Sequence, residues 1–389
     1  MKTIYLDNNS TTPLLQEVKE GIIDILHRYG NPSSMHTEGR AVQSLMDDAI
    51  KNIADFYGCN PRDMIFTSCA TESNNMIMNM LLQNKYDYQP HIIISNIEHP
   101  SIYETAKYLE KNGVAVTYAK VSPDGVVDPE TVKREIRSET KLISVMFANN
   151  EIGTIQPIEE IGKIAHEKNI FFHTDAVQAS GKIPFSLKDF PVDAASFSAH
   201  KMYAPKGIGL LYVKNLNDKK GILKPLLFGG HQARGFRAGT ENTFGIIAYG
   251  IACKVMKKMI KTDMEHMRFL RDTFEELVVN NIPDIIINGG NAPRKVDTSN
   301  ISFKYIEGES ILLRLDLDRI CVSTGSACST GSLEPSHVIM AIANKEETAH
   351  GSVRFSFGRE NTLEEVKFAV QKLEETVTFL RKISPLTPK

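Results

Sequence analysis

The sequence predicts an α/β protein with a largely parallel sheet, followed by a smaller α+β domain. Short apolar segments alternate with amphipathic ones as far as about residue 250, and this order is typical of helices that cover both faces of a parallel sheet. Several apolar segments are continuous rather than alternating, as expected for strands that are buried on both faces. Beyond that point the pattern changes to a long helical segment and two further strands, which indicates a second domain.

Six segments of the first domain combine the length of a strand with many branched or aromatic side chains. They are residues 64–68, 91–95, 141–147, 170–176, 194–198 and 209–213. Helical spacing of apolar residues, with Pro or Ser at the start, marks segments 101–113, 129–137 and 157–169. In the second domain we expect a long helix over 254–279 and strands over 299–306 and 352–357.

The composition is that of an ordinary globular protein, with 42% hydrophobic and 24% charged residues among 389. Lys and Arg number 45 against 47 Asp and Glu, so the net charge of −2 leaves no basic field to attract nucleic acid. No apolar run has the length of a membrane span, and Asp7 stands where a signal peptide would be apolar. We therefore expect a cytoplasmic protein that binds neither nucleic acid nor a membrane.

The cysteines favour reduced thiols over disulfides or a metal site. They are odd in number and widely scattered, and no two of them form a CxxC pair. The five are Cys59, Cys69, Cys253, Cys321 and Cys328. We expect no bound metal, and any thiol that takes part in chemistry to act singly.

Three features are expected to meet at the carboxyl edge of the sheet. The strand 64–68 runs directly into a helix, so the free N–H groups around Ala70 and Thr71 can bind an anion. Asp175 lies at the carboxyl end of the predicted strand 170–176, and Lys201 follows the strand 194–198. Each residue also has a simpler interpretation. Thr71 and Asp175 could each cap a helix, and Lys201 could be a solvated lysine in a turn. Together they form the set that pyridoxal 5'-phosphate needs: a phosphate cradle, a carboxylate for the ring nitrogen and a lysine.

Ten motifs in order along the chain resemble the class I cysteine desulfurases, which are pyridoxal-phosphate enzymes of fold type I in the class V aminotransferase superfamily. They are "YLDNNSTTP", "YGNPSSMHTEGR", "ATESNN", "EHPS", "NNEIGTIQPI", "HTDAVQ", "SFSAHK", "RAGTEN", "STGSACS" and "AHGSVRFSFGR". The resemblance implies a large domain, residues 15–253, with a mainly parallel seven-stranded sheet. It implies a small α+β domain made of residues 1–14 and 254–389, which carries the cysteine loop.

The resemblance also implies roles for single residues at the cofactor ring. Lys201 would hold the cofactor as a Schiff base and would move the proton of the substrate Cα. Asp175 would pair with the ring nitrogen, Gln178 would donate to the ring oxygen, and His99 would stack on the ring and serve in proton transfer.

Further residues would bind the phosphate and the substrate. The phosphate ligands would be Thr71, Ser198 and His200, joined by Thr240 from the partner subunit of a homodimer. Asn150 and Arg354 would bind the substrate carboxylate, a task that suits the planar fork of an arginine.

Cys328 would select the reaction. Its context "STGSACSTGS" is small and polar, and the resemblance makes its thiolate the nucleophile that takes sulfur from cysteine as a persulfide and leaves alanine. The sulfur would then pass to an acceptor protein, in iron–sulfur assembly or another thiolation pathway. Selenocysteine lyase, aminotransferase and a catalytically silent scaffold remain as alternatives.

Four positions depart from the pattern of the family and put the shape of two loops in doubt. These are Ala204, where Gly is common, Cys69, where Gly or Ser is common, His231 in place of Gly and Ala233 in place of Glu. They bear on the loop near the phosphate, on the subunit boundary and on the choice of sulfur acceptor.

Overall fold

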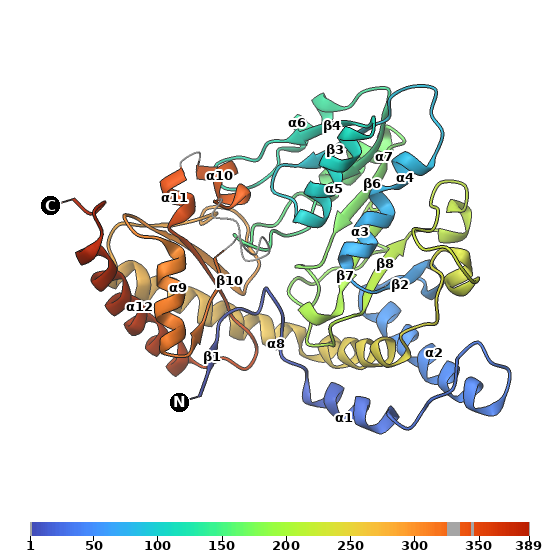
Figure 1. Cartoon of the computed structure of the whole chain (residues 1–389), viewed down its shortest axis with the longest axis horizontal. Coiled ribbons are helices and arrows are strands. Elements are labelled where there is room, and N and C mark those ends of the chain that lie inside the picture. The colour runs from blue at the N-terminus through green and yellow to red at the C-terminus, as the bar shows by residue number, and fades with distance from the viewer. Residues whose placement is uncertain (1, 325–334, 344–345, 389) are drawn as a thin grey trace.

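A computed structural model describes residues 2–324, 335–343 and 346–388 of the chain. Figure 1 shows a larger part built around one sheet, a smaller part that carries the C-terminus, and the long helix α8 (Thr243–Asn281) running beneath both. The predicted α/β class with an additional smaller α+β region is confirmed.

The larger sheet has seven strands within the described residues, in the spatial order β2-β8-β7-β6-β5-β3-β4. Only β8 runs antiparallel to its neighbours, so the prediction of a mainly parallel seven-stranded sheet is confirmed. The strands are β2 (Met64–Thr67), β3 (His91–Ser95), β4 (Ala115–Ala119), β5 (Thr140–Ser144), β6 (Phe171–Asp175), β7 (Ala194–Ser198) and β8 (Gly209–Val213).

Six of these strands lie where the sequence predicts them, and β3, β7 and β8 match to the residue. The seventh, β4, was missed. It is an edge strand that pairs only with β3 among the described strands, and four of its five residues are half-buried. An edge strand needs fewer apolar side chains than a central one, because it has one neighbour instead of two.

Helices cover both faces of the sheet. On one face lie α3 (Ala70–Met78), α4 (Met80–Gln83) and α5 (Pro100–Lys111); on the other lie α2 (Thr37–Tyr57), α6 (Pro129–Glu135), α7 (Ile158–Glu167) and the first half of α8, with α1 (Gln16–Ile25) packed on α8. Side chains alternate between the two cores, as Ile92 and Ile94 of β3 belong to one and Ile93 to the other. The predicted helices 101–113, 129–137 and 157–169 are confirmed to within about two residues.

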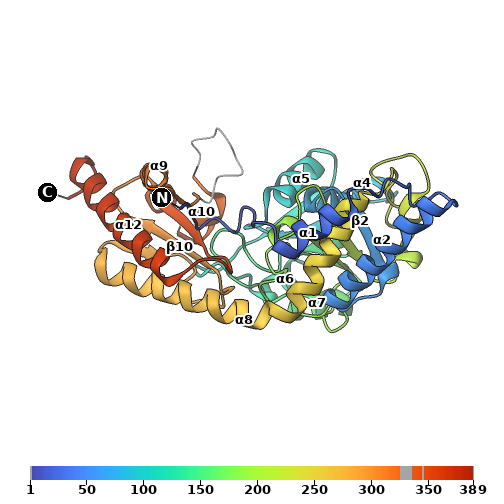
Figure 2. The same cartoon turned by 90° about the horizontal axis from the view of Figure 1, so that it is seen from below.

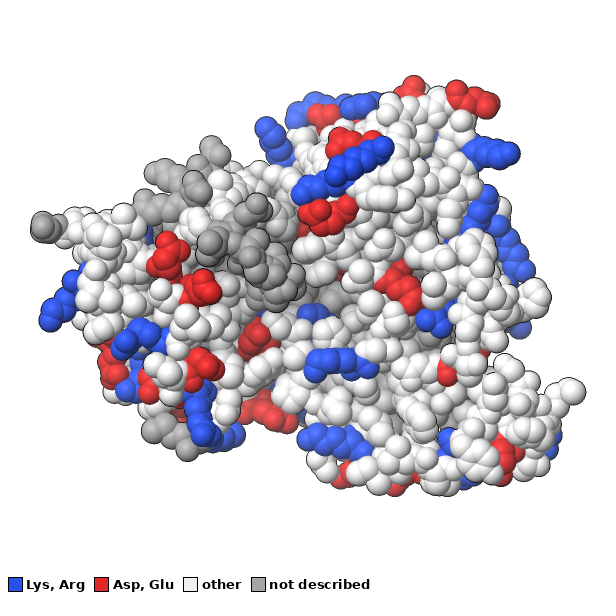
Figure 3. Space-filling view, viewed as in Figure 1, with Lys and Arg blue, Asp and Glu red and all other residues white. Residues whose placement is uncertain are grey.

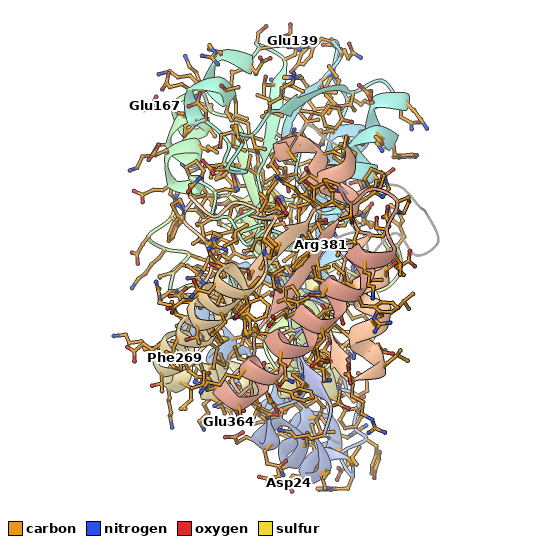
Figure 4. All side chains as sticks on the ribbon, turned by 90° about the vertical axis from the view of Figure 1, so that its left-hand side faces the viewer. Asp24, Glu139, Glu167, Phe269, Glu364 and Arg381 are labelled. Carbon is orange, nitrogen blue, oxygen red and sulfur yellow. The ribbon has the colours of Figure 1, made fainter. Side chains whose placement is uncertain are left out.

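The smaller part is an antiparallel sheet covered by helices. Among the described residues its strands are β9 (Ile285–Ile287), β10 (Thr298–Phe303) and β12 (Ser352–Ser356), with β10 in the middle. A short parallel pair joins β1 (Ile4–Tyr5) to β11 (Ile320–Cys321). The helices are α9 (Gly308–Leu317), α10 (His337–Ala343), α11 (Glu346–His350) and α12 (Leu363–Ile383). Figure 4 shows α12 beside α8, where Arg381 donates to the carbonyls of Pro283 and Asp284 just beyond the end of α8.

The helix α8 contributes to the cores of both parts. Its side chains from Ile246 to Met256 pack on the larger sheet, and those from Leu270 to Val278 pack on the smaller one. Figure 2 shows α8 running along both parts. The boundary expected between residues 253 and 254 therefore falls inside a continuous helix, and the division into two domains at that point stays a prediction.

The surface in Figure 3 carries acidic and basic side chains intermingled, without a large area of one sign on that face. None of the helices in the described part of the chain is both long enough and apolar enough to span a bilayer.

Candidate active site

One cavity of about 300 Å³ brings together most of the residues that the sequence singles out. It lies at the carboxyl ends of β6 and β7, beside the first turn of α3 and against β12 of the smaller part. Its lining includes Ala70, Thr71, His99, Asn150, Asp175, Gln178, Ser198, His200, Lys201 and Arg354. The predicted convergence at the carboxyl edge of the sheet is thus seen in the structure.

The first turn of α3 offers uncapped N–H groups to the cavity. The N-cap residue is Cys69, not Thr71; it has extended backbone angles and its side chain makes no capping hydrogen bond. Glu72 does not fill this position either, because its carboxylate accepts from the N–H of Ser68 and from Nε of Arg237. Burial acts to raise the pKa of Glu72, but the hydrogen bonds from Arg237 and Ser68 and the charge of Arg237 together outweigh it, and the pKa is lowered. An anion in the cavity would therefore meet helix N–H groups that no protein carboxylate occupies.

Asp175 is the last residue of β6 and is almost fully buried. Its Oδ2 accepts from Nδ2 of Asn74 at 2.7 Å, and its Oδ1 accepts from the N–H of Val177 at 3.0 Å. A carboxylate can accept about four hydrogen bonds, so Asp175 keeps acceptor capacity for a cationic N–H in the cavity it lines.

Asp175 is linked to His99 through two side chains that the sequence reasoning missed. Asn74 of α3 also donates to Oγ of Ser101 at 2.8 Å, and this hydroxyl lies 2.8 Å from Nδ1 of His99. The N–H of Ser101 donates to the same Nδ1 at 3.1 Å. Since Nδ1 is an acceptor, the neutral ring of His99 carries its proton on Nε2. Burial lowers the pKa of His99, Asp175 opposes this and Lys201 adds to it, so the neutral form is favoured.

Lys201 ends a short 3₁₀ turn, η2 (Ala199–Lys201), directly after β7. Its Nζ donates to the backbone carbonyls of Asn9 and Ser10, at 2.6 Å each. The neighbouring His200 contacts Oγ1 of Thr11 through Nδ1 at 3.1 Å, and burial, with Lys201 nearby, lowers the pKa of His200 to about 4. The N-terminal segment therefore forms one wall of the site, which no local pattern around Lys201 could reveal.

Arg354 of β12 is buried and held on three sides. It donates to the carbonyl of Asn150 at 3.0 Å, to Oγ of Ser10 at 2.7 Å and to Oδ1 of Asp7 at 2.8 Å. Its Nε is a buried donor without a hydrogen-bond acceptor among the described residues. Arg354 also lines the cavity, and a guanidinium is suited to binding a carboxylate.

Gln178 also lines the cavity and is supported by a further missed residue, Lys295. Its Nε2 donates to the carbonyl of Asn9 at 3.1 Å, and its Oε1 accepts from Nζ of Lys295 at 2.9 Å. The only signal that could have pointed to Lys295 is a lysine close to the buried strand β10, in "RKVDTSNISF".

One predicted residue in the described part of the chain does not line this cavity. Thr240 is exposed and borders a separate hollow, together with Thr67 and Ser68. Cys328 lies outside the described residues. Among the described residues, His, Cys, Asp and Glu side chains nowhere gather in a group of three or more that could hold a metal ion.

The four departures lie in or near these loops. Cys69 is the N-cap of α3 and lines the cavity, and Ala204 is buried just after η2. His231 is exposed and stands at the start of η4 (Gln232–Gly235), in which Ala233 has a positive φ of 44°. A positive φ is costly for alanine, so the loop that leads to Thr240 is held by its surroundings.

Comparison with known proteins assigns the family. Residues 4–368 match the family model described as Aminotransferase class-V. The chain is 45% identical to "Cysteine desulfurase IscS" of Dictyoglomus turgidum, over 99% of this chain and 97% of the relative. A solved structure of a NifS-like protein matches with a TM-score of 0.89 and 37% identity, covering 97% of this chain and 100% of that one. A structure described as SspA in complex with cysteine matches with a TM-score of 0.79 and 33% identity, covering 92% and 100%. This chain therefore belongs to the Aminotransferase class-V family and, within it, to the cysteine desulfurases.

Proposed function

We propose that the protein is a pyridoxal-phosphate-dependent cysteine desulfurase that converts L-cysteine to L-alanine, takes the sulfur onto Cys328 as a persulfide and passes it to an acceptor protein. The observation that carries this is the meeting of Lys201, Asp175 and Arg354 with the uncapped turn of α3 in one cavity. The full-length similarity to cysteine desulfurases supports the reaction.

The residues present fit the cofactor. The uncapped N–H groups of α3 suit its phosphate, joined by the side chains of Thr71, Ser198 and His200. Asp175 has the acceptor capacity for its protonated ring nitrogen, and Gln178 has a second N–H for its ring oxygen. When bound there, pyridoxal phosphate supplies the electron sink that stabilises negative charge on the substrate Cα.

The side chains of the protein divide the remaining work. Arg354 binds the carboxylate of cysteine in the cavity that it lines, while Asp7 and Ser10 fix the direction of its guanidinium. Asn150 lies beside it in the cavity and completes the carboxylate site. Lys201 removes the Cα proton once its amine is released, and His99 offers a proton at Nε2, because Nδ1 is held by Ser101.

The reaction can be tested directly. The purified protein with pyridoxal phosphate and L-cysteine should form alanine and, in the presence of a thiol reductant, an equal amount of sulfide, both measured by chromatography and a sulfide assay. Turnover of selenocysteine alone would make it a selenocysteine lyase, and amino transfer to a keto acid would make it an aminotransferase. Absence of all three reactions in a cofactor-loaded sample would leave only a binding scaffold.

The active site is proposed to be completed in a homodimer, with Thr240 donating to the phosphate of the partner subunit. Support comes from large apolar side chains that are strongly exposed on the larger part, Tyr29, Met35 and Phe228 among them, at 84%, 89% and 85%. Phe228 lies in the segment that leads to Thr240, so its exposed ring is available for contact with a partner subunit there.

Light scattering should therefore give twice the mass of the chain. Phe228→Asp, which places a charge on this surface, should shift the particle toward the monomer and lower cysteine turnover, with Phe269→Asp, on the exposed side of α8, as the control. A wild-type monomer with full activity would refute the dimeric site.

The acceptor protein and the cellular place also remain proposals. We propose an iron–sulfur scaffold or a thiolation enzyme as the acceptor, in the cytoplasm, where reduced thiols persist. The acceptor is the protein that gains labelled sulfur from the enzyme.

A further inference from the structure

Lys295 is a buried lysine in contact with the wall of the cofactor cavity. Its side chain is 0% exposed, and its Nζ donates to Oδ1 of Asn9 at 2.5 Å and to Oε1 of Gln178 at 2.9 Å. Asn9 and Gln178 both line the cavity. Burying a charged amine costs free energy, so the role of a lysine at this position has to be explained.

The charge of Lys295 is balanced only in part. Asp297 lies between two buried lysines, accepting from Lys182 and lying 3.1 Å from Nζ of Lys295. Burial acts to raise the pKa of Asp297, but the two lysines outweigh it and lower the pKa strongly. Burial lowers the pKa of Lys295 to about 7, against the effect of Asp297, while Lys182 and Arg354 add to the lowering. With both lysines protonated the cluster carries one net positive charge, next to Gln178.

A protonated lysine can only donate hydrogen bonds, so the end of the Gln178 amide that faces it must be the oxygen. The nitrogen then faces the other way, where one N–H donates to the carbonyl of Asn9. The second N–H is left for the cavity. If Oε1 lost its donor, it would be a buried acceptor without a partner and the amide would be free to rotate.

Lys295 also supports the wall that holds the catalytic lysine. The orientation of the Asn9 amide is fixed by hydrogen bonds at both ends. Its Nδ2 donates to the carbonyl of Asn150 and to Oγ1 of Thr298, and its Oδ1 accepts from Lys295. The carbonyl of the same Asn9 accepts from both Lys201 and Gln178.

We propose that Lys295 is a positioning residue, which fixes the orientation of the Gln178 amide so that its N–H, and not its oxygen, meets the ring oxygen of the bound cofactor. This inference rests on the proposed function, because it takes pyridoxal phosphate as the occupant of the cavity. Lys295 touches neither cofactor nor substrate; it acts on cofactor binding through Gln178.

The test compares Lys295→Met with Lys182→Met. Both lysines are buried against Asp297, but Lys182 makes no hydrogen bond to Gln178, so it controls for disturbance of the charge cluster. The apoenzymes are titrated with pyridoxal phosphate, and binding is followed by absorbance. The dissociation constant of Lys295→Met should be about tenfold larger than that of the wild type, which is the effect of one lost hydrogen bond. The absorbance maximum of the bound cofactor should shift as well. Lys182→Met should stay within about twofold of the wild type in affinity.

A double-mutant cycle tests the route through Gln178. In a Gln178→Ala background, adding Lys295→Met should change the affinity by less than about twofold, because the amide that Lys295 orients is absent. A full additional loss would show that Lys295 acts elsewhere and would overturn the proposal, as would equal effects of Lys182→Met and Lys295→Met.

The pH profile gives a readout that a merely structural role would not move. A neutral Lys295 has two N–H groups for three acceptors, Asn9, Gln178 and Asp297, so one of them must lose its donor. The other hydrogen bonds of Asn9 keep its oxygen facing Lys295, and the charge of Asp297 keeps that carboxylate paired with it. Gln178 is therefore the acceptor that loses its donor. The wild type should therefore exceed Lys295→Met in affinity for pyridoxal phosphate by a larger factor at about pH 6 than at about pH 8.5. The same factor at both pH values would contradict the proposal. Failure of the wild type to bind pyridoxal phosphate would refute the proposed function instead.

Discussion

Replacing Lys201 with alanine is expected to lower the turnover of L-cysteine by at least about a thousandfold, since it removes both the covalent anchor of the cofactor and the group that moves the Cα proton. The fold should persist. Its Nζ donates to the carbonyls of Asn9 and Ser10 beside the cavity, and the loss of a hydrogen bond of this kind costs about 1 kcal/mol.

Absorbance and chemical trapping measure this prediction. The wild type should be yellow with bound cofactor, and borohydride should fix the cofactor to Lys201 alone, as located by peptide mass spectrometry. Lys206→Ala is the matched control, because Lys206 lies on the same loop and is exposed. Labelling of any other lysine, or turnover by Lys201→Ala near the wild-type rate, would refute the assignment of Lys201.

The second large effect is expected for Cys328→Ser, which should bind cofactor and show the spectral change on addition of cysteine but release no sulfide. Cleavage of the C–S bond requires a thiolate. Burial raises the pKa of Cys59 to about 12 and the pKa of Cys253 and of Cys321 above the usual value, so these thiols stay protonated at neutral pH. Mass spectrometry after incubation with cysteine should find the labile sulfur on the peptide containing "STGSACSTGSLEPSH".

Cys69 is the control that the structure makes necessary. It lines the same cavity as Lys201 and His99, so it is the described thiol best placed to compete with Cys328. Cys69→Ser should leave persulfide formation largely intact. If the added sulfur mapped to Cys69, or if Cys328→Ser formed alanine at the wild-type rate, the nucleophile would have to be reassigned.

Secondary structure could be predicted wherever the pattern of side chains is local and strong. Every residue of the central strands β3, β7 and β8 is buried, because helices cover both faces of the sheet, and the ends of these strands match the prediction. The edge strand β4 is only half-buried, so it was missed. The helix α8 begins eleven residues before the predicted start at 254, because its first turns are buried nearly all round and show no amphipathic period.

By itself the sequence determined the α/β class and, through the order of its motifs, the residues of the candidate site that line one cavity. Only the tertiary structure decided what holds them. The supporting residues come from three separate segments: Asn9 from the N-terminal segment, Asn74 from α3 and Lys295 from the loop before β10. Each forms a hydrogen bond with a residue of the site that is more than 25 positions away in the sequence. A hydrogen bond between residues so distant in sequence leaves no periodicity or spacing to read, because it arises only when folding closes the loops between them.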